Sequence, residues 1–176
     1  MRIIGGKLRG RTITPPAEYN ARPTTDFAKE GLFNILMNEI DFEDSALLDL
    51  FSGTGAISFE FASRGCRDIT SIELAPANTT FIKRTAKLLG INNIHIIRHN
   101  VFDFVKICTK KFDIVFADPP YSLNGLETLP ESCISLLKEN GLFILEHPGT
   151  FNFDSNPYYY KEKKYGNVHF SFFKAK

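Results

Sequence analysis

Short apolar runs that alternate with helix-like segments constrain the fold of this chain more than any other feature. Five runs have the length and composition of buried strands: residues 46–51 (ALLDLF), 68–74 (DITSIEL), 94–98 (IHIIR), 112–117 (FDIVFA) and 142–146 (LFILE). Helical signals lie between them, over residues 57–63, 77–89, 102–108 and 126–138. Because helical crossovers join strands that run parallel, we predict an α/β fold with a mostly parallel sheet covered on both faces.

The N-terminal residues depart from this alternation. Residues 2–4 and 11–14 predict two short extended segments around glycines, so we interpret residues 1–22 as a short extended arm. A helix is expected to begin just after Thr24 or Thr25, because either hydroxyl can cap a first turn.

The C-terminal residues depart from it in another way. Residues 158–164 and 168–173 predict an antiparallel hairpin added at one edge of the sheet. With 176 residues, the chain is long enough for one domain with a sizeable core and too short for two ordinary ones. We therefore predict a single domain, in which residues 23–176 form the core.

The composition excludes several classes of protein. No apolar run approaches the length of a membrane span, and the first residues lack a signal-peptide stretch, so we expect a cytoplasmic protein with no membrane partner. Cys66, Cys108 and Cys133 are too far apart to suggest a zinc site or a disulfide framework. The four histidines lack ligand spacing, so we predict no metal. A monomer is the simplest expectation.

The charges are unevenly distributed along the chain. Residues 1–22 and residues 161–176 each carry a net charge of +4, although the whole chain carries only +1. Basic ends around an acidic middle favour a polyanionic partner. Arginine suits bidentate phosphate contacts, so the arm is the stronger candidate. The lysine-rich C-terminal group is equally consistent with a solvated surface.

A glycine-containing loop follows the first predicted strand. Its candidate binding residues are Asp49, Phe51, Ser52, Gly53, Thr54 and Gly55. In open parallel sheets, ligands bind outside the carboxyl ends of the strands, where glycines let backbone N–H groups approach them. Glu73 ends the second strand, where a carboxylate can accept two ribose hydroxyls. We hypothesise that Asp49 and the loop hold the methionine end of S-adenosylmethionine.

Two other interpretations of this loop stay open. A dinucleotide motif would need a third glycine at Ser58, so S-adenosylmethionine is favoured over NAD. Alternatively, Asp49 is a structural carboxylate bonded to the loop backbone, because a carboxylate in an apolar strand needs a partner.

The motif Asp118-Pro119-Pro120-Tyr121 follows the fourth predicted strand and is the more specific signal. Two prolines enforce a stiff, extended exit from the strand, which can aim the Asp118 carboxylate and the Pro119 carbonyl at one point. Two such acceptors can hold the N–H bonds of an exocyclic base amine, while Tyr121 stacks on the base. The motif therefore predicts methylation of a nucleic-acid base, whereas a rigid loop with a capping aspartate is the structural alternative.

With both motifs in place, the chain resembles the RsmD-type 16S rRNA guanine-N2 methyltransferases of bacteria. The resemblance covers essentially the whole chain. It rests on residues 2–11, residues 22–26, Glu30, Leu32, Phe33, Asn34, residues 49–56, Glu73, Asn100 and residues 118–121. The arm and the Arg22-Pro23-Thr24 segment separate this family from other base-amine methyltransferases.

The resemblance implies a class I, Rossmann-like methyltransferase fold of seven strands with one antiparallel strand. S-adenosylmethionine would be the cofactor, with its ribose at Glu73 and its adenine at Asn100 and Val101. The substrate would be guanine 966 of 16S rRNA within an assembled small ribosomal subunit. RNA would contact Arg2, Lys7, Arg9, Arg11, Arg22 and Thr24. Asn100 is a departure from the aspartate that many methyltransferases have at this position.

Three competing functions remain. An adenine-N6 methyltransferase acting on DNA or RNA could use the same four-residue motif, which does not separate the two amines. An RNA-binding assembly factor could keep the fold without turnover, although the intact motifs weigh against it. An NAD-dependent oxidoreductase is disfavoured by the missing third glycine.

Overall fold

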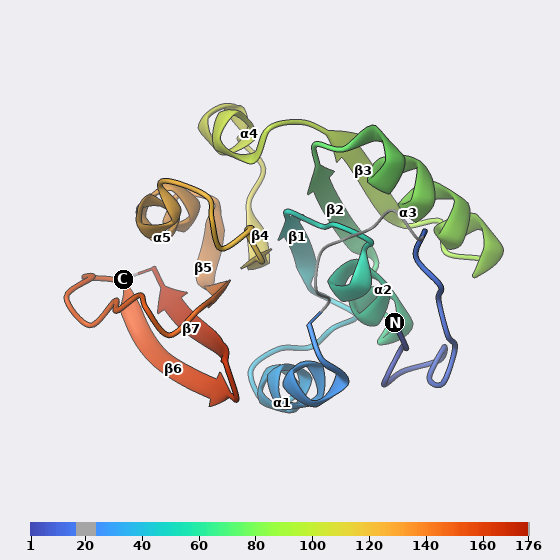
Figure 1. Ribbon diagram of the computed structural model, residues 1–176, viewed down its shortest axis with the longest axis horizontal. Coiled ribbons are helices and arrows are strands. Elements are labelled where there is room, and N and C mark those ends of the chain that lie inside the picture. Colours follow the sequence, from blue (N-terminus) through green and yellow to red (C-terminus); the bar gives the residue numbers. More distant parts are fainter. Residues whose placement is uncertain (17–23, 176) are drawn as a thin grey trace.

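The computed structural model describes residues 1–16 and 24–175, and a seven-stranded sheet forms its centre (Figure 1). The strands are β1 (Ala46–Leu50), β2 (Asp68–Glu73), β3 (Ile94–Arg98), β4 (Phe112–Ala117), β5 (Leu137–His147), β6 (Tyr159–Tyr165) and β7 (Val168–Lys174). They lie in the order β3-β2-β1-β4-β5-β7-β6. Neighbouring strands among β1–β5 pair in parallel, and β7 runs antiparallel to β5 and β6. The predicted mostly parallel sheet with an antiparallel hairpin at one edge is confirmed.

Helices lie on both sides of this sheet (Figure 1). They are α1 (Asp26–Leu36), α2 (Ala56–Ser63), α3 (Pro76–Leu88), α4 (Val101–Ile107), the 3-10 helix η1 (Leu126–Thr128) and α5 (Leu129–Ile134). Helix α1 begins after Thr25, whose Oγ1 accepts a hydrogen bond from the backbone N–H of Ala28 at 3.2 Å. Of the two predicted caps, Thr25 is therefore the one that the structure uses.

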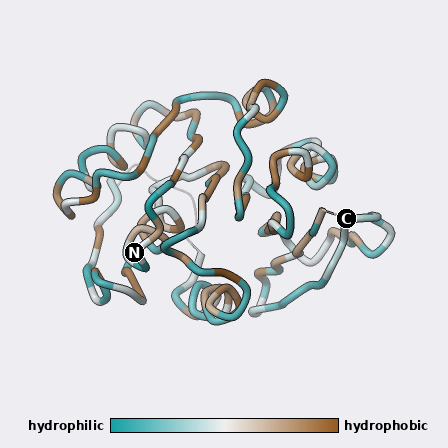
Figure 2. Tube along the Cα trace, turned by 180° about the vertical axis from the view of Figure 1, so that it is seen from behind, coloured by the Kyte–Doolittle hydropathy of each residue, from teal (hydrophilic) through white to brown (hydrophobic). Residues whose placement is uncertain are grey.

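The central strands are buried on both faces, which explains their continuous apolar sequences. In β1, Leu48 and Leu50 pack with α4 and α5, whereas Leu47 packs with α1 and α2. Successive side chains of a strand point to opposite faces, so each face needs its own helical cover. Helix α3 alternates hydrophilic and hydrophobic residues along its length (Figure 2), and its buried residues are Thr79, Ile82, Thr85 and Ala86. None of the helices in the described ranges combines the length and apolarity needed to cross a membrane.

The N-terminal arm packs beside α2 and α3 (Figure 1). Arg2 and Thr12 form an antiparallel bridge, so the predicted pair of extended segments is confirmed. Ile3 and Ile13 are buried in a cluster that includes Phe59 of α2. The arm is therefore fixed to the domain by its apolar side.

A buried ion-pair cluster also anchors the arm. The Glu60 carboxylate is fully buried and accepts a hydrogen bond from the backbone N–H of Ile4 at 2.7 Å. Lys29 Nζ lies 3.3 Å from Glu60 Oε1 and donates to the backbone carbonyl of Arg2. Arg64 pairs with the other carboxylate oxygen of Glu60. This arrangement connects α1, α2 and the arm.

One predicted helix is wrong in its extent. We predicted a largely helical segment over residues 126–138, but α5 ends at Ile134 and β5 begins at Leu137. Phe112 pairs with Leu137, and its backbone N–H donates to the carbonyl of Leu136 at 2.9 Å. Pairing with β4 satisfies backbone groups that the helix would otherwise have used, so long-range contacts override local propensity.

Candidate active site

The loop after β1 has the sharp turns that its glycines predicted. Gly53 has a φ of 55° and Gly55 a φ of 80°, both in the left-handed region that favours glycine. A Cβ at Gly55 would also lie 3.0 Å from Phe59 and 3.2 Å from Ile82. Phe51 has a φ of 57° without being glycine, a conformation that is uncommon and tends to occur at functional sites.

Other loop residues keep this turn in place. The Ser52 hydroxyl donates to the carbonyl of Asp49 at 2.7 Å, and its N–H donates to the carbonyl of Ile72 at 3.0 Å. Thr54 is buried and contacts the sulfur of Met1 at 3.5 Å. The loop is therefore a rigid surface at the carboxyl end of β1.

Asp49 has a structural partner, as the alternative interpretation of the loop required. Its Oδ2 accepts hydrogen bonds from the hydroxyl of Ser58 at 2.6 Å and from the N–H of Ser58 at 3.2 Å. Burial nevertheless raises the pKa of Asp49 to about 7, because desolvation outweighs these bonds and the Glu73 carboxylate adds repulsion. A cation at this place would stabilise the charged form, so a binding role remains compatible with the structural one.

Glu73 lies beside the loop at the end of β2, where the sequence placed it. Its Oε2 accepts a hydrogen bond from the N–H of Gly53 at 2.8 Å, and its Oε1 accepts one from the N–H of Ala75 at 2.8 Å. Each carboxylate oxygen can accept more than one hydrogen bond, so capacity for ribose hydroxyls remains. The structure therefore brings Glu73 and the glycine loop into direct contact.

Asn100 and Val101 follow β3, the neighbour of β2. The side-chain oxygen of Asn100 accepts a hydrogen bond from the N–H of Asp103 at 3.3 Å and caps α4. Val101 is buried in the core. Asn100 is exposed and so remains accessible to a ligand at this edge.

The four-residue motif after β4 lies at the same edge of the sheet as the glycine loop. Leu50 pairs with Ala117, so Phe51 and Asp118 follow directly at the ends of neighbouring strands. The pKa of Asp118 is raised well above its usual range by burial and by the nearby carboxylates of Glu146 and Asp49. Pro119 is buried, Pro120 is exposed, and Tyr121 is 45% exposed.

Glu146 is a site residue that sequence reasoning missed. It is only 3% exposed near the end of β5, and it accepts a hydrogen bond from the Thr24 hydroxyl at 2.8 Å. The Tyr121 hydroxyl contacts its other oxygen at 3.5 Å. Burial raises the pKa of Glu146 to about 7. A signal was present in the sequence, because this carboxylate ends an apolar strand predicted to lie in the same parallel sheet as Asp118.

The predicted RNA-binding residues fall into two places. Arg2, Lys7, Arg9 and Arg11 are exposed on the arm. Arg2 is partly engaged, since its Nε lies 3.1 Å from Asp26. Thr24 instead lies at Glu146, beside the motif after β4. Arg22 is outside the residues that the structure describes.

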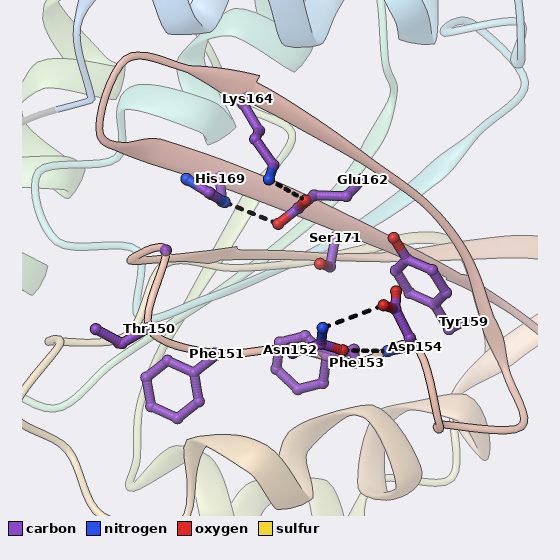
Figure 3. Close-up of a pocket in the computed structure, with 11 residues that line it drawn as sticks. Thr150, Phe151, Asn152, Phe153, Asp154, Tyr159, Glu162, Lys164, His169 and Ser171 are labelled. Atoms are coloured by element: carbon purple, nitrogen blue, oxygen red, sulfur yellow. Dashed lines mark hydrogen bonds and ion pairs between the residues drawn. The ribbon is translucent and has the colours of Figure 1, made fainter.

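A separate cavity of about 220 Å³ lies between the β6–β7 hairpin and residues 149–154 (Figure 3). Glu162 is its best-connected side chain, with His169 Nδ1 at 2.8 Å and Lys164 Nζ at 3.2 Å. The predicted catalytic and cofactor residues are not among those that line it. Because Glu162 bonds to His169 and Lys164, and Asp154 to Asn152, we assign the cavity to the packing of the hairpin.

The residues at the strand ends fit S-adenosylmethionine, which carries a sulfonium and an ammonium group. Asp49 provides an acidic group whose pKa burial raises, and a nearby cation would favour its charged form. Glu73 supplies acceptors beside the glycine loop. Within residues 1–16 and 24–175, no group of three or more His, Cys, Asp or Glu side chains is placed to hold a metal ion.

Comparison with known proteins places the chain in a family. The family model described as "Conserved hypothetical protein 95" matches residues 1–174. A ribosomal RNA small subunit methyltransferase D from Buchnera aphidicola subsp. Baizongia pistaciae is 36% identical over 183 residues, which cover 98% of this chain and 91% of the relative. The chain belongs to this family. The predicted RsmD-type resemblance is confirmed.

Solved structures agree with this assignment. A structure from Escherichia coli, described as a candidate methyltransferase, has a TM-score of 0.85 and 30% identity, and the match covers 100% of this chain and 99% of that one. A more distant candidate methyltransferase, complexed with S-adenosylhomocysteine, has a TM-score of 0.71 at 20% identity, with 84% of this chain and 49% of that chain covered. The second likeness shows a shared fold. The chain therefore shares its fold with solved structures described as candidate methyltransferases.

Proposed function

We propose that this chain transfers a methyl group from S-adenosylmethionine to the exocyclic N2 amine of a guanine in 16S ribosomal RNA. The chain is an S-adenosylmethionine-dependent RNA methyltransferase, as its family and fold indicate. The finer assignment, to guanine 966 in an assembled small subunit, rests on the resemblance of the sequence to RsmD-type methyltransferases. The protein would act as a monomer in the cytoplasm.

One observation carries the proposal. Asp49 and Asp118, which are 69 positions apart in the sequence, lie at the carboxyl ends of neighbouring parallel strands, where Leu50 pairs with Ala117. A cofactor on the glycine loop after β1 therefore lies next to acceptors on the turn after β4. This juxtaposition is what transfer between a bound donor and a base amine requires.

The chain's own residues supply positioning and a proton acceptor. S-adenosylmethionine supplies an electrophilic methyl group on a sulfonium. Asp118 and the carbonyl of Pro119 would each accept a hydrogen bond from an N–H of the amine and so orient its lone pair for attack. Bound S-adenosylmethionine would supply the methyl group and leave as S-adenosylhomocysteine, and Asp118 would accept the proton that the methylated amine loses. Tyr121 would stack on the base and hold it outside the RNA helix.

The decisive experiment compares substrates and identifies the modified base. Purified protein is incubated with labelled cofactor and with small ribosomal subunits, free 16S rRNA or DNA, and the products are digested to nucleosides. Methylation at N2 of a guanine in the subunit or in 16S rRNA is expected. N6-methyladenosine would support the competing adenine assignment, and an absence of transfer would support an assembly factor. Mapping modified nucleotides in rRNA from cells that lack the protein would identify the position.

A further inference from the structure

Glu146 lies next to the proposed catalytic turn on the neighbouring strand. Ala117 of β4 pairs with Leu145 of β5, so Asp118 and Glu146 are the next residues of the two parallel strands. Neighbouring strands are about 4.8 Å apart. The carboxylate of Glu146 is therefore close to any amine that Asp118 holds.

The described contacts of Glu146 fix its place and use two of its acceptor positions. Thr24 donates to Oε2 at 2.8 Å, and the Tyr121 hydroxyl contacts Oε1 at 3.5 Å. Both partners are neutral hydroxyls, and two carboxylate oxygens together offer about four acceptor positions.

The surroundings of Glu146 favour a hydrogen-bond donor as its further partner. Among residues 1–16 and 24–175, none of the ion pairs that the structure forms involves Glu146 or Asp118. Burial raises the pKa of Glu146 to about 7, so its ionised form is present around neutral pH and is poorly solvated. A buried acceptor of this kind gains most from a donor that is itself buried on binding.

We propose that Glu146 distinguishes guanine from adenine by accepting the N1–H of the target base. On guanine, the N1–H lies directly beside the N2 amine on the same edge of the ring. Asp118 and the Pro119 carbonyl hold the amine, and Glu146 holds the adjacent ring N–H. Adenine has an unprotonated N1 beside its amine, so the same carboxylate would face a lone pair. The inference rests on the proposed function and names the group that selects its substrate.

The selectivity expected from such a group is large. A site built to bond a substrate N–H leaves its own buried acceptor unpaired when the substrate lacks that group, and rejection by about 10⁴-fold is then attainable. Substitution of a residue that only supports the fold would lower the methylation rate of all substrates equally. Selectivity between substrates is therefore the measurement that separates the two roles.

A matched pair of bases tests the proposal. One small subunit is reconstituted with guanine at the target position and another with 2-aminopurine, which keeps the 2-amine but has an unprotonated N1. Wild-type kcat/KM should be at least about 100-fold higher for guanine. Glu146→Gln should lower this ratio to within about 10-fold, because its amide can either accept a hydrogen bond or donate one to N1. The exposed Glu127→Gln serves as the control and should keep the wild-type ratio.

Each outcome has a defined meaning. If wild-type protein methylates 2-aminopurine as well as guanine, the proposal is wrong, and this result does not depend on any variant. An unchanged ratio in a folded Glu146→Gln variant, with both rates lowered equally, would assign Glu146 a supporting role only. If wild-type protein does not methylate guanine at all while it methylates adenine, the proposed function itself fails.

Discussion

Two groups of buried carboxylates in this protein are held in opposite ways. Glu60 is fully buried between α1, α2 and the arm, and two cations, Lys29 and Arg64, pair with it. Asp49 and Glu146 are almost as buried at the carboxyl edge of the sheet, but the donors that the structure shows for them are hydroxyl and backbone N–H groups.

We infer that this difference separates a structural anchor from a binding site. A buried charge with its countercharge in place has no need of a ligand, and removing one partner is what destabilises it. Among the described residues, no cation pairs with Asp49 or Glu146, and burial raises the pKa of each carboxyl group. Such a group can stabilise a cationic ligand when one arrives, so the acidic edge is where the cofactor is expected.

The largest effect is expected at the anchor. Glu60→Gln leaves Lys29 and Arg64 without their carboxylate and should lower the free energy of unfolding by about 3–5 kcal/mol. Denaturant unfolding measures this. Glu43→Gln, which breaks the exposed pair with Arg67, is the control and should cost less than about 1 kcal/mol. Equal effects of the two variants would show that the Glu60 cluster does not act as a structural anchor.

A comparable effect, on rate instead of stability, is expected at the acidic edge. Asp118→Ala should lower kcat by about 10²–10³-fold, because one acceptor of the amine is removed. Cofactor affinity, measured by calorimetry, should stay within a few-fold of wild type. Asp113→Asn is the control on the same strand, since Asp113 contacts Ala46 and Lys138. A collapse of cofactor binding in Asp118→Ala would show that its role is misassigned.

A smaller effect is expected in the pH dependence of stability. The pKa of Asp49 in the folded protein, about 7, is above its usual value, so the folded state holds the proton more tightly than the unfolded state. The stabilisation that protonated Asp49 gives the folded state is therefore fully present below pH 4 and is lost as pH rises from about 4 through 7. In wild type this loss lowers the free energy of unfolding by on the order of 2 kcal/mol, and Asp49→Asn should make the decline smaller. Thermal or denaturant unfolding across this pH range measures it.

The variant Asp49→Asn also tests whether Asp49 contributes to cofactor binding. Ionised Asp49 would stabilise a cation, so wild-type affinity for S-adenosylmethionine should rise with pH through about 7. Asp49→Asn should bind more weakly and with a flatter pH profile in calorimetric titrations. A profile identical to wild type would mean that Asp49 is structural only.

The smallest effect is expected on the exposed face of the arm. Replacing Arg9 and Arg11 with alanine should weaken RNA binding and lower its salt slope by about 1 for each phosphate that an arginine no longer neutralises. Filter binding at several salt concentrations measures the slope. Arg67→Ala, an exposed arginine outside the arm, is the control. An unchanged slope in the double variant would exclude these two arginines from RNA binding.

Much of the fold was predictable because local and long-range signals agree. The strands at β1 to β4 are short apolar runs bounded by turns, and their boundaries were predicted within one residue. The segment before β5 could not be predicted in this way. Its polar residues Lys138, Glu139 and Asn140 resemble the end of a helix, but pairing of Leu137 with Phe112 extends the strand through them.

The candidate site was predictable only where the residues form a motif. The glycine loop and residues 118–121 are contiguous in the sequence, so their chemistry could be inferred before their geometry. Glu146 and Glu60 are single carboxylates in apolar segments, and their partners Thr24 and Lys29 come from distant positions. Such pairs are visible only in the folded protein, although a lone acid in an apolar run is itself a signal.

The arm described above has a further consequence for how a nucleic acid would be recognised. Its backbone is held by Ile3, Ile13 and the Glu60 cluster, while Arg9 and Arg11 project into solvent. A partner that binds these guanidinium groups meets a surface whose main chain is already ordered, so association requires little loss of backbone entropy. The ordered arm would then fix the distance between the bound phosphate and the reacting base.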